Sequence, residues 1–380
     1  MGKRGDEVKN VVEGSRAVAE AVKLCEPKVI AVYPITPQTH IAETLAKMVA
    51  DGEIDAELIR VESEQSAMAA CIGAQATGVR TYTATASQGL ALMHEMLFVA
   101  SGMRIPVVMT VANRALNSPL NIWNDQQDSF SQRDTGWIQL YVENAQEGFD
   151  TQIQAFKIAQ ETRLPVMVCL DGFVISHTYE PVNYISKEKV KKFLPEYKPK
   201  FSLNPERPVS MGTLGTPEYY IHFRHQLHFA LLQAEKNIKK TNEDYGKISG
   251  RTYGNGLIET INLEGSERAL ITIGSVTGTA RVLSKETGVG LIRIRSLRPF
   301  PAEEIQNVCK NLKAVGVIEK DVSFGLNGAL YTEVKAALQK HNIPVSGFIA
   351  GLGGKDITVQ NIKEIMQKIK EGKEGTEWVL

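Results

Sequence analysis

The sequence predicts an α/β protein with two parallel-sheet domains, and three observations support this fold class. The chain has 380 residues, which is more than one hydrophobic core usually holds. Short β-rich runs alternate with longer helical patterns in two separate stretches, as expected of βαβ units. A proline-rich stretch without this alternation separates them.

The first alternating stretch runs from Lys28 to Gly172. Its expected strands cover residues 29–33, 56–61, 80–86, 106–112 and 165–170. Its expected helices cover residues 40–50, 65–76, 90–101 and 146–162. Gly52 and Gly78 follow two of these helices, where a C-terminal cap favours a residue that tolerates positive φ. This order predicts a mainly parallel sheet with helices on both faces.

The stretch 180–265 predicts a surface connector followed by a helix over residues 219–240. Six of the 15 prolines lie between positions 181 and 217, and a proline cannot donate to a central strand. The second alternating stretch follows, with expected strands at 269–273, 290–294, 315–318 and 345–349 and helices at 277–285, 302–312, 329–340 and 359–370. We therefore expect domains at 1–179 and 266–380, with the connector at 180–265.

Charge and hydropathy exclude several classes of partner. Lysine plus arginine and aspartate plus glutamate both number 43, so the net charge is 0 and there is no broad positive field for general nucleic-acid binding. No apolar run approaches the roughly 20 residues that cross a bilayer. The segment Met1 to Glu7 turns polar where a signal peptide would become apolar. We expect a cytoplasmic protein with neither a nucleic-acid nor a membrane partner.

The cysteines predict no metal or cluster site on this chain. Their spacing is too wide for a zinc or iron–sulfur motif, which favours isolated buried thiols at Cys25, Cys71, Cys169 and Cys309. Any redox centre used by the protein would then lie elsewhere. His222, His225 and His228 are spaced three residues apart, which favours a solvated helix face over a metal site.

Polar residues follow the expected strands of the first domain, at the edge where ligands bind in open parallel sheets. Thr36 follows the first strand, Glu62 and Glu64 the second, Ser87 and Gln88 the third, and Arg114 the fourth. Together they predict a functional site.

Each of these residues also has a purely structural explanation. Thr36 before Pro37 is typical of a helix N-cap, and Glu64 can complement a helix dipole. Ser87 can belong to an ordinary strand-to-helix turn, and Arg114 to a loop salt bridge. Their occurrence at one edge favours the functional interpretation.

Several long strings resemble the α subunit of pyruvate:ferredoxin oxidoreductase, in the 2-oxoacid:ferredoxin oxidoreductase family. The strings are Tyr33 to Pro37, Val61 to Glu64, Thr83 to Leu90, Asn113 to Trp137, Arg298 to Pro301 and Ile349 to Gly354. The resemblance covers nearly the whole chain. It implies a pyrimidine-type domain for thiamine diphosphate, followed by a smaller transketolase-C-terminal-like α/β domain.

The resemblance also implies partners and a division of the cofactors. A β subunit would hold the diphosphate, Mg²⁺ and a [4Fe-4S] cluster, and γ- and δ-type subunits would carry further clusters toward ferredoxin. This division of the cofactors agrees with the sequence, which contains neither a Gly-Asp-Gly motif nor a cysteine cluster. Asp171-Gly172-Phe173 lacks the preceding glycine, and we expect a strand end there.

Roles for individual residues follow from the same resemblance. Glu64 is the expected catalytic carboxylate, because a carboxylate that bonds N1′ of the pyrimidine makes the 4′-amino group basic enough to deprotonate thiamine. Glu62 faces the same side of an extended segment, so spacing cannot choose between the two and only the resemblance favours Glu64. Thr36 and Arg114 are expected to bind the carboxylate of pyruvate. Cofactor contacts are expected at Pro34, Ser87 and Gln88.

The activity that the resemblance implies is reversible oxidative decarboxylation of pyruvate with coenzyme A to acetyl-CoA and CO₂, with electrons passed to ferredoxin. Three alternatives stay open at this point: the same chemistry on another 2-oxoacid, a non-catalytic scaffold subunit, and a nicotinamide dehydrogenase. The dehydrogenase is disfavoured because Gly351-Leu352-Gly353-Gly354 is followed by Asp356 where the dinucleotide fingerprint needs glycine.

Overall fold

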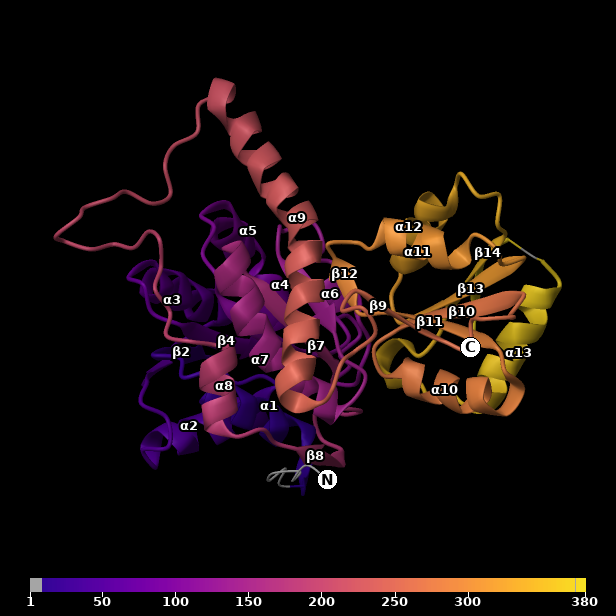
Figure 1. Ribbon diagram of the computed structural model, residues 1–380, viewed down its shortest axis with the longest axis horizontal. Coiled ribbons are helices and arrows are strands. Elements are labelled where there is room, and N and C mark those ends of the chain that lie inside the picture. Colours follow the sequence, from indigo (N-terminus) through magenta and orange to yellow (C-terminus); the bar gives the residue numbers. More distant parts are fainter. Residues whose placement is uncertain (1–8, 373) are drawn as a thin grey trace.

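The computed structural model describes residues 9–372 and 374–380, which form two large sheets flanked by helices and one small sheet (Figure 1). The first large sheet has seven strands in the order β12-β6-β7-β5-β4-β2-β3. All are parallel except β12, which runs antiparallel to β6 at the edge. The strands are β2 (Val29–Val32), β3 (Glu57–Arg60), β4 (Thr81–Thr85), β5 (Val108–Asn113), β6 (Ile138–Tyr141), β7 (Val166–Asp171) and β12 (Ser296–Arg298).

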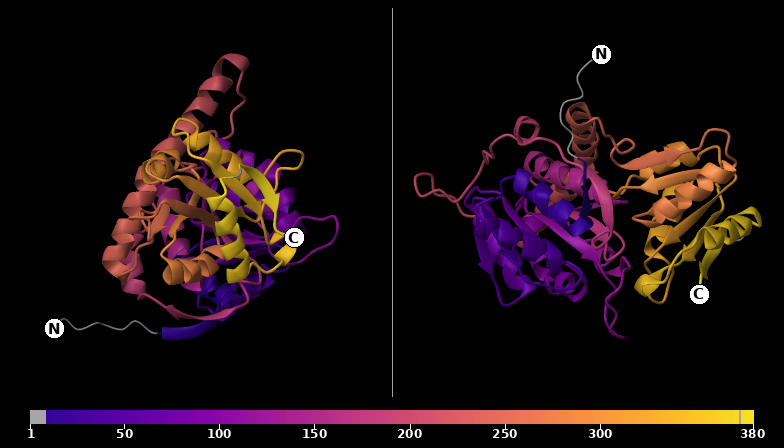
Figure 2. Two further views of the ribbon diagram at one scale, coloured as in Figure 1. Left: turned by 90° about the vertical axis from the view of Figure 1, so that its right-hand side faces the viewer. Right: turned by 90° about the horizontal axis from the view of Figure 1, so that it is seen from below.

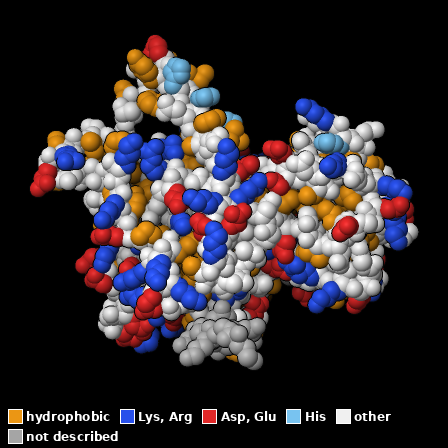
Figure 3. All heavy atoms as spheres, in the orientation of Figure 1, with side chains coloured by type: hydrophobic (Ala, Val, Ile, Leu, Met, Phe, Trp, Pro, Cys, Tyr) orange, Lys and Arg blue, Asp and Glu red, His pale blue; other side chains and the backbone are white. Residues whose placement is uncertain are grey.

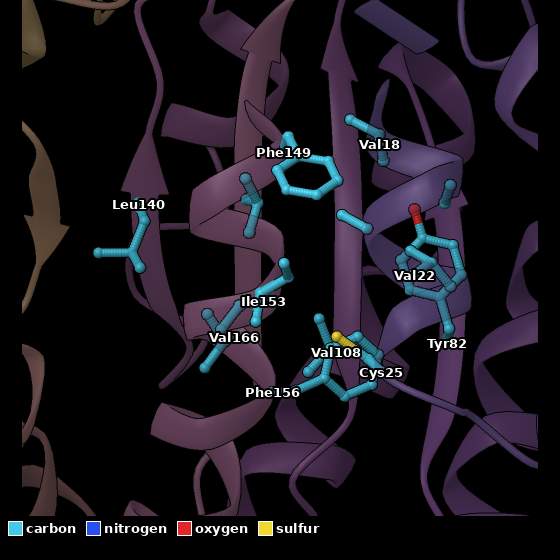
Figure 4. Close-up of a cluster of buried hydrophobic side chains, with 14 of the residues drawn as sticks. Val18, Val22, Cys25, Tyr82, Val108, Leu140, Phe149, Ile153, Phe156 and Val166 are labelled. Carbon is cyan, nitrogen blue, oxygen red and sulfur yellow. The ribbon is translucent and has the colours of Figure 1, made fainter. Parts of the chain in front are cut away.

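Helices cover both faces of this sheet. One face packs against α1 (Gly14–Leu24), α2 (Thr39–Ala50) and α7 (Ala145–Thr162). The other packs against α3 (Glu64–Ala76), α4 (Ser87–Leu92), α5 (His94–Gly102) and α6 (Gln127–Phe130). Figure 4 shows the first of these cores, where Val18 and Val22 of α1 and Phe149 of α7 lie over Val108 of the sheet. The five expected strands and the helices expected at 40–50, 65–76 and 146–162 are confirmed. The helix expected at 90–101 is divided at Met93 into α4 and α5, and α1, α6, β6 and β12 were not predicted.

The connector contains more regular structure than expected. β1 (Lys9–Glu13) and β8 (Tyr179–Asn183) form a two-stranded antiparallel sheet, followed by α8 (Lys187–Phe193) and α9 (Pro217–Ser249). The 33-residue α9 is longer than predicted; it begins with proline at its first position and ends before Gly250, whose φ is 74°. Its amino-terminal half projects from the body (Figure 1), and Figure 3 shows apolar and histidine side chains on the projecting end.

Two predictions made for this connector are confirmed. No proline lies in a central strand, since Pro181 belongs to the two-stranded sheet. His222, His225 and His228 are exposed, as expected of a solvated helix face. None of the helices in the described part of the chain combines the length and apolar character needed to span a membrane.

The second large sheet has the order β15-β14-β13-β10-β11-β9, parallel except for β9. Its strands are β9 (Ile258–Ile261), β10 (Arg268–Ile273), β11 (Gly290–Ile294), β13 (Ala314–Glu319), β14 (Val345–Ile349) and β15 (Gly375–Trp378). One face packs against α10 (Val276–Thr287) and α13 (Val359–Lys370). The other packs against α11 (Ala302–Cys309) and α12 (Ala329–Leu338). The expected elements are confirmed, and β9 and β15 are additional.

The two large sheets lie side by side (Figure 2) and are joined by apolar and ionic contacts. One apolar cluster runs from α3 and α5, through Leu297 of β12, to α11 and α12. Glu147 of α7 is buried and binds Arg293 and Arg295 at the end of β11, with 2.9 Å between Glu147 Oε1 and Arg295 Nε. The division of the chain into three parts, at residues 179/180 and 265/266, stays a prediction. Strand β12 follows the boundary at 265/266 in the sequence, but it pairs with β6 of the first large sheet.

Candidate active site

The loops that carry the predicted site residues meet at the carboxyl edge of the first sheet. The chain passes from β2 outward to β3, and then returns through α3 to β4 on the other side of β2. The connections that follow β2 and β4 therefore run in opposite directions, which makes this edge a topological switch point. Such a switch point is where parallel sheets bind ligands.

Glu64 is the first residue of α3 and its side chain is buried, with 7% of the residue exposed. Ser63 caps the helix by accepting a hydrogen bond from the backbone N–H of Ser66 at 3.2 Å. Within residues 9–372 and 374–380, the Glu64 carboxylate has no hydrogen-bond or ion-pair partner. A largely enclosed carboxylate without a protein partner is free to accept a hydrogen bond from a ligand.

Gly89 lets helix α4 approach the Glu64 side chain. A Cβ at this position would lie 2.5 Å from both Glu64 Oε1 and Thr85 Oγ1. The Thr85 hydroxyl is itself buried and has no hydrogen-bond partner among the described residues. The Glu64 carboxylate and the unsatisfied Thr85 hydroxyl therefore both lie against Gly89.

Glu62 has a different environment, which separates it from Glu64. It is exposed, and its Oε1 accepts a hydrogen bond from the Ser66 hydroxyl at 2.5 Å. This bond lowers the pKa of Glu62, which keeps the group an ordinary surface carboxylate. The structure thus distinguishes two glutamates that spacing alone could not.

Ser87 begins α4 in the left-handed region, with φ +50°, which is uncommon for a residue with a side chain. Its hydroxyl lies 2.5 Å from both the carbonyl of Ala115 and Oε1 of Gln88, and its single hydrogen can be donated to either oxygen. Its backbone N–H donates to Asp128 Oδ2 at 2.9 Å. The turn after β4 is therefore held in a specific conformation by the segment that follows β5.

Asp128 is the residue that joins these loops, and the sequence did not single it out. Its buried carboxylate also accepts from the backbone N–H of Arg114 at 3.0 Å and from the side-chain amide of Asn113 at 2.7 Å. Burial raises the pKa of Asp128 to about 6, although these donors oppose the shift. One carboxylate thus fixes the ends of both β4 and β5.

The structure brings Arg114 and Thr36 together. Arg114 Nη1 donates to the backbone carbonyl of Thr36 at 3.0 Å, and Arg114 Nε donates to the carbonyl of Asn121 at 3.1 Å. Arg114 forms no salt bridge with the described residues, so the loop-salt-bridge explanation is wrong. Its Nη2 group has no protein partner in the same part of the chain and remains available to an anion.

The N-cap explanation of Thr36 is also wrong. A turn closes between the Gln38 N–H and the Ile35 carbonyl at 2.7 Å, so α2 begins only at Thr39, with Gln38 at the cap position. Thr36 is exposed at this edge of the sheet. Pro34 lies on the same loop and is exposed, without a direct contact to the other predicted residues.

A second set of contacts closes the site against the second sheet. Asp171 ends β7, as expected, and Lys320 binds it at 2.9 Å. Burial alone would raise the pKa of Asp171, but Lys320 and neighbouring donors lower it below the usual value. Gly353 packs against the loop after β5: its carbonyl accepts from Asn121 Nδ2 at 3.0 Å, and its N–H donates to Asp125 Oδ2 at 3.2 Å. The glycine-rich segment therefore forms a contact between the sheets.

Comparison with known proteins agrees with this geometry. Residues 20–243 match the family described as pyruvate flavodoxin/ferredoxin oxidoreductase, thiamine diphosphate-binding, and residues 266–362 match pyruvate:ferredoxin oxidoreductase core domain II. Pyruvate synthase subunit PorA of Methanocaldococcus jannaschii is 51% identical over 379 residues, covering 97% of both chains. Ketoisovalerate oxidoreductase subunit VorA of Pyrococcus horikoshii is 45% identical over 372 residues, covering 96% of this chain and 94% of the relative.

The fold is similar to that of a solved protein as well. The 2-oxoglutarate:ferredoxin oxidoreductase from Magnetococcus marinus superposes with a TM-score of 0.69 at 20% identity, over 98% of this chain and 66% of that one. The chain belongs to the pyruvate flavodoxin/ferredoxin oxidoreductase family, with a thiamine diphosphate-binding domain. The predicted fold class, including the smaller second α/β domain, is confirmed.

The residues present fit thiamine diphosphate. An aminopyrimidine needs a carboxylate for its ring nitrogen, and Glu64 is a buried carboxylate without a protein partner. The carboxylate is also held in place, because the absence of a side chain at Gly89 lets α4 pack directly against Glu64.

Proposed function

We propose that this chain is the catalytic α subunit of a multi-subunit pyruvate:ferredoxin oxidoreductase, or pyruvate synthase. The reaction is the reversible oxidative decarboxylation of pyruvate with coenzyme A to acetyl-CoA and CO₂, with electrons passed to ferredoxin. The observation that carries the proposal is the buried, unpartnered carboxylate of Glu64 at the switch point of the sheet.

Thiamine diphosphate, when bound, supplies the carbon nucleophile that attacks the keto carbon and the electron sink for decarboxylation. Glu64 shares a proton with N1′ of the pyrimidine, and burial strengthens this interaction because few water molecules compete for it. Ser87 and Gln88 hold the turn beside the ring, and the backbone near Pro34 lines the opposite side. The chain thus orients the cofactor and tunes its basicity.

Arg114 and Thr36 bind the substrate carboxylate in this proposal. The free Nη2 group of Arg114 supplies charge-assisted hydrogen bonds, and the exposed Thr36 hydroxyl supplies a further donor. The bond from Arg114 Nη1 to the Thr36 carbonyl keeps both groups at one place. This placement selects small 2-oxoacid anions as a class.

The partner subunits complete the proposal. A β subunit would bind the diphosphate and Mg²⁺ and carry a [4Fe-4S] cluster, with γ- and δ-type subunits leading to ferredoxin, in the cytoplasm. The four cysteines of this chain are free and buried, which supports cluster binding on other chains. The subunit names of the relatives support a heteromeric enzyme.

The test is reconstitution of the chain with its partners, followed by ferredoxin reduction assayed with pyruvate and coenzyme A. We expect turnover that depends on both substrates and on thiamine diphosphate. A complex that assembles fully and yet shows no reduction with any 2-oxoacid would contradict the proposal and favour a scaffold subunit.

Specificity for another 2-oxoacid is the second candidate. It is favoured by the 45% identity to a ketoisovalerate oxidoreductase subunit, and the carboxylate-binding residues do not discriminate between 2-oxoacids. Comparison of kcat/KM for pyruvate and 2-oxoisovalerate decides between the two. We expect pyruvate to be preferred; a higher value for the branched acid would assign the second specificity.

A further inference from the structure

A cluster of three potential metal ligands lies outside the site described above. Glu13 ends β1, His40 lies in the first turn of α2, and His177 lies between β7 and β8. Their ligand atoms all lie within 4.8 Å of one another. We propose that Glu13, His40 and His177 bind a divalent transition-metal ion of the zinc type.

The distances are close to those that a metal requires. Glu13 Oε1 lies 2.6 Å from His40 Nδ1 and 3.9 Å from His177 Nδ1. Donors at the usual zinc bond lengths in a tetrahedron lie roughly 3.3 Å apart, between these two values. The imidazole rings of His40 and His177 lie with their centroids 4.4 Å apart, so binding would also turn these side chains to bring all three ligand atoms around one ion. A water molecule would complete the tetrahedron.

The charges in the cluster also favour a cation. Among the described residues, the only ionic partners of Glu13 are the two histidines. No lysine or arginine of the described residues pairs with the Glu13 carboxylate, so an ion bound between the three side chains would meet a negative charge and no permanent positive one. A divalent ion would neutralise that carboxylate.

The backbone holds two of the three ligands together before any ion binds. A Cβ at Gly14 would lie 2.0 Å from the Ile175 carbonyl, so only glycine allows this close crossing of the chain. Ser15 then donates its N–H and its hydroxyl to the Ser176 carbonyl, both at 2.8 Å. Glu13 and His177 are thereby placed on adjacent segments. The Ser176 hydroxyl, 2.7 Å from His177 Nδ1, would give up this contact to the ion.

The site has a path for ion entry and borders the candidate active site. The side chains of His40 and Glu13 are 47% and 17% exposed. His40 follows Thr36 by four residues, and a Cβ at Gly172 would lie 2.5 Å from Pro37 Cγ. A bound ion would therefore connect the loop after β2 with the loop after β7.

The test is a titration of the chelator-stripped full chain with ZnCl₂ against a chromophoric competitor. We expect one tight equivalent, with the affinity reduced at least tenfold in His40→Ala, in His177→Ala and in Glu13→Gln. We also expect zinc to raise the Tm of the wild-type chain and to leave the Tm of the His177→Ala variant unchanged.

The matched control is the triple variant His222→Ala, His225→Ala and His228→Ala, which removes three exposed histidines of α9 and should keep the tight equivalent. Circular dichroism checks folding, and His177→Asn replaces His177→Ala if the latter does not fold. The proposal is overturned if the wild-type chain takes up no stoichiometric zinc. It is equally overturned if the His40→Ala/His177→Ala double variant binds as tightly as the wild type, or if the α9 variant loses the site.

Discussion

Replacement of Glu64 by glutamine tests the central residue of the proposed mechanism with little change in shape. Glutamine fills the same volume beside Gly89 and Thr85 but cannot share a proton with a pyrimidine nitrogen as a carboxylate does. A positioned general acid–base contributes typically about 10²–10⁴ in rate, which corresponds to about 2.7–5.4 kcal/mol in activation free energy. We expect pyruvate-dependent ferredoxin reduction by the assembled complex to fall by this factor.

The stability of the Glu64→Gln variant should change little. The carboxylate has no protein partner among the described residues, so its removal breaks no hydrogen bond. Glutamine has nearly the same size as glutamate, so it also fits against Gly89 and Thr85. We expect the free energy of unfolding in urea to stay within about 1 kcal/mol of the wild-type value.

The matched control is Glu62→Gln, two residues away and exposed. It removes one hydrogen bond to Ser66, and we expect turnover within twofold of wild type. Wild-type turnover in Glu64→Gln, or an equal loss in both variants, would refute the assignment of the catalytic carboxylate.

Three further predictions concern neighbouring features. Arg114→Lys should lower kcat/KM for pyruvate about 10- to 100-fold, because a lysine ammonium cannot bond the Thr36 carbonyl and also present two coplanar donors to the substrate. An unchanged kcat/KM would contradict substrate binding by Arg114. Gly89→Ala should lower the free energy of unfolding, measured in urea, by about 1–3 kcal/mol, because the new Cβ overpacks against Glu64 and Thr85. Gly73→Ala places its Cβ with nothing within 4 Å and should raise the free energy of unfolding slightly. Glu147→Gln should lower the free energy of unfolding by about 3–5 kcal/mol, because the buried Arg293 and Arg295 lose their shared carboxylate. A loss below about 1 kcal/mol would show that these two ion pairs contribute little to stability.

The sequence placed the candidate residues correctly where the argument depended on strand ends, while their roles stay predictions. Parallel strands deliver whatever follows them to one edge, so Glu64, Ser87 and Arg114 could be placed together without knowledge of the strand order. The choice of Glu64 over Glu62 needed either family resemblance or the observed burial. Periodicity could not distinguish Glu64 from Glu62, because residues two positions apart lie on the same side of an extended segment.

The sequence did not predict features that depend on long-range pairing. β12 has three residues and joins β6 across more than 150 positions, and no local periodicity reports such a partner. Asp128 and the cluster around Glu13 were missed for the same reason, since their neighbours come from segments far apart in the chain. The N-cap expected at Thr36 failed because an additional turn precedes α2, and the turn is set by the packing of Arg114 on this loop.

The position of β12 has a consequence for biosynthesis of the protein. The amino-terminal sheet acquires its last edge strand only after residue 298 has been translated, when β13, β14 and β15 of the carboxyl-terminal sheet have yet to be made. A nascent or truncated chain that stops at the end of α9 would expose the unpaired edge of β6, and open edges invite association with other chains. Separate expression of the two halves should therefore yield an aggregation-prone amino-terminal fragment, and addition of the other half should suppress its aggregation.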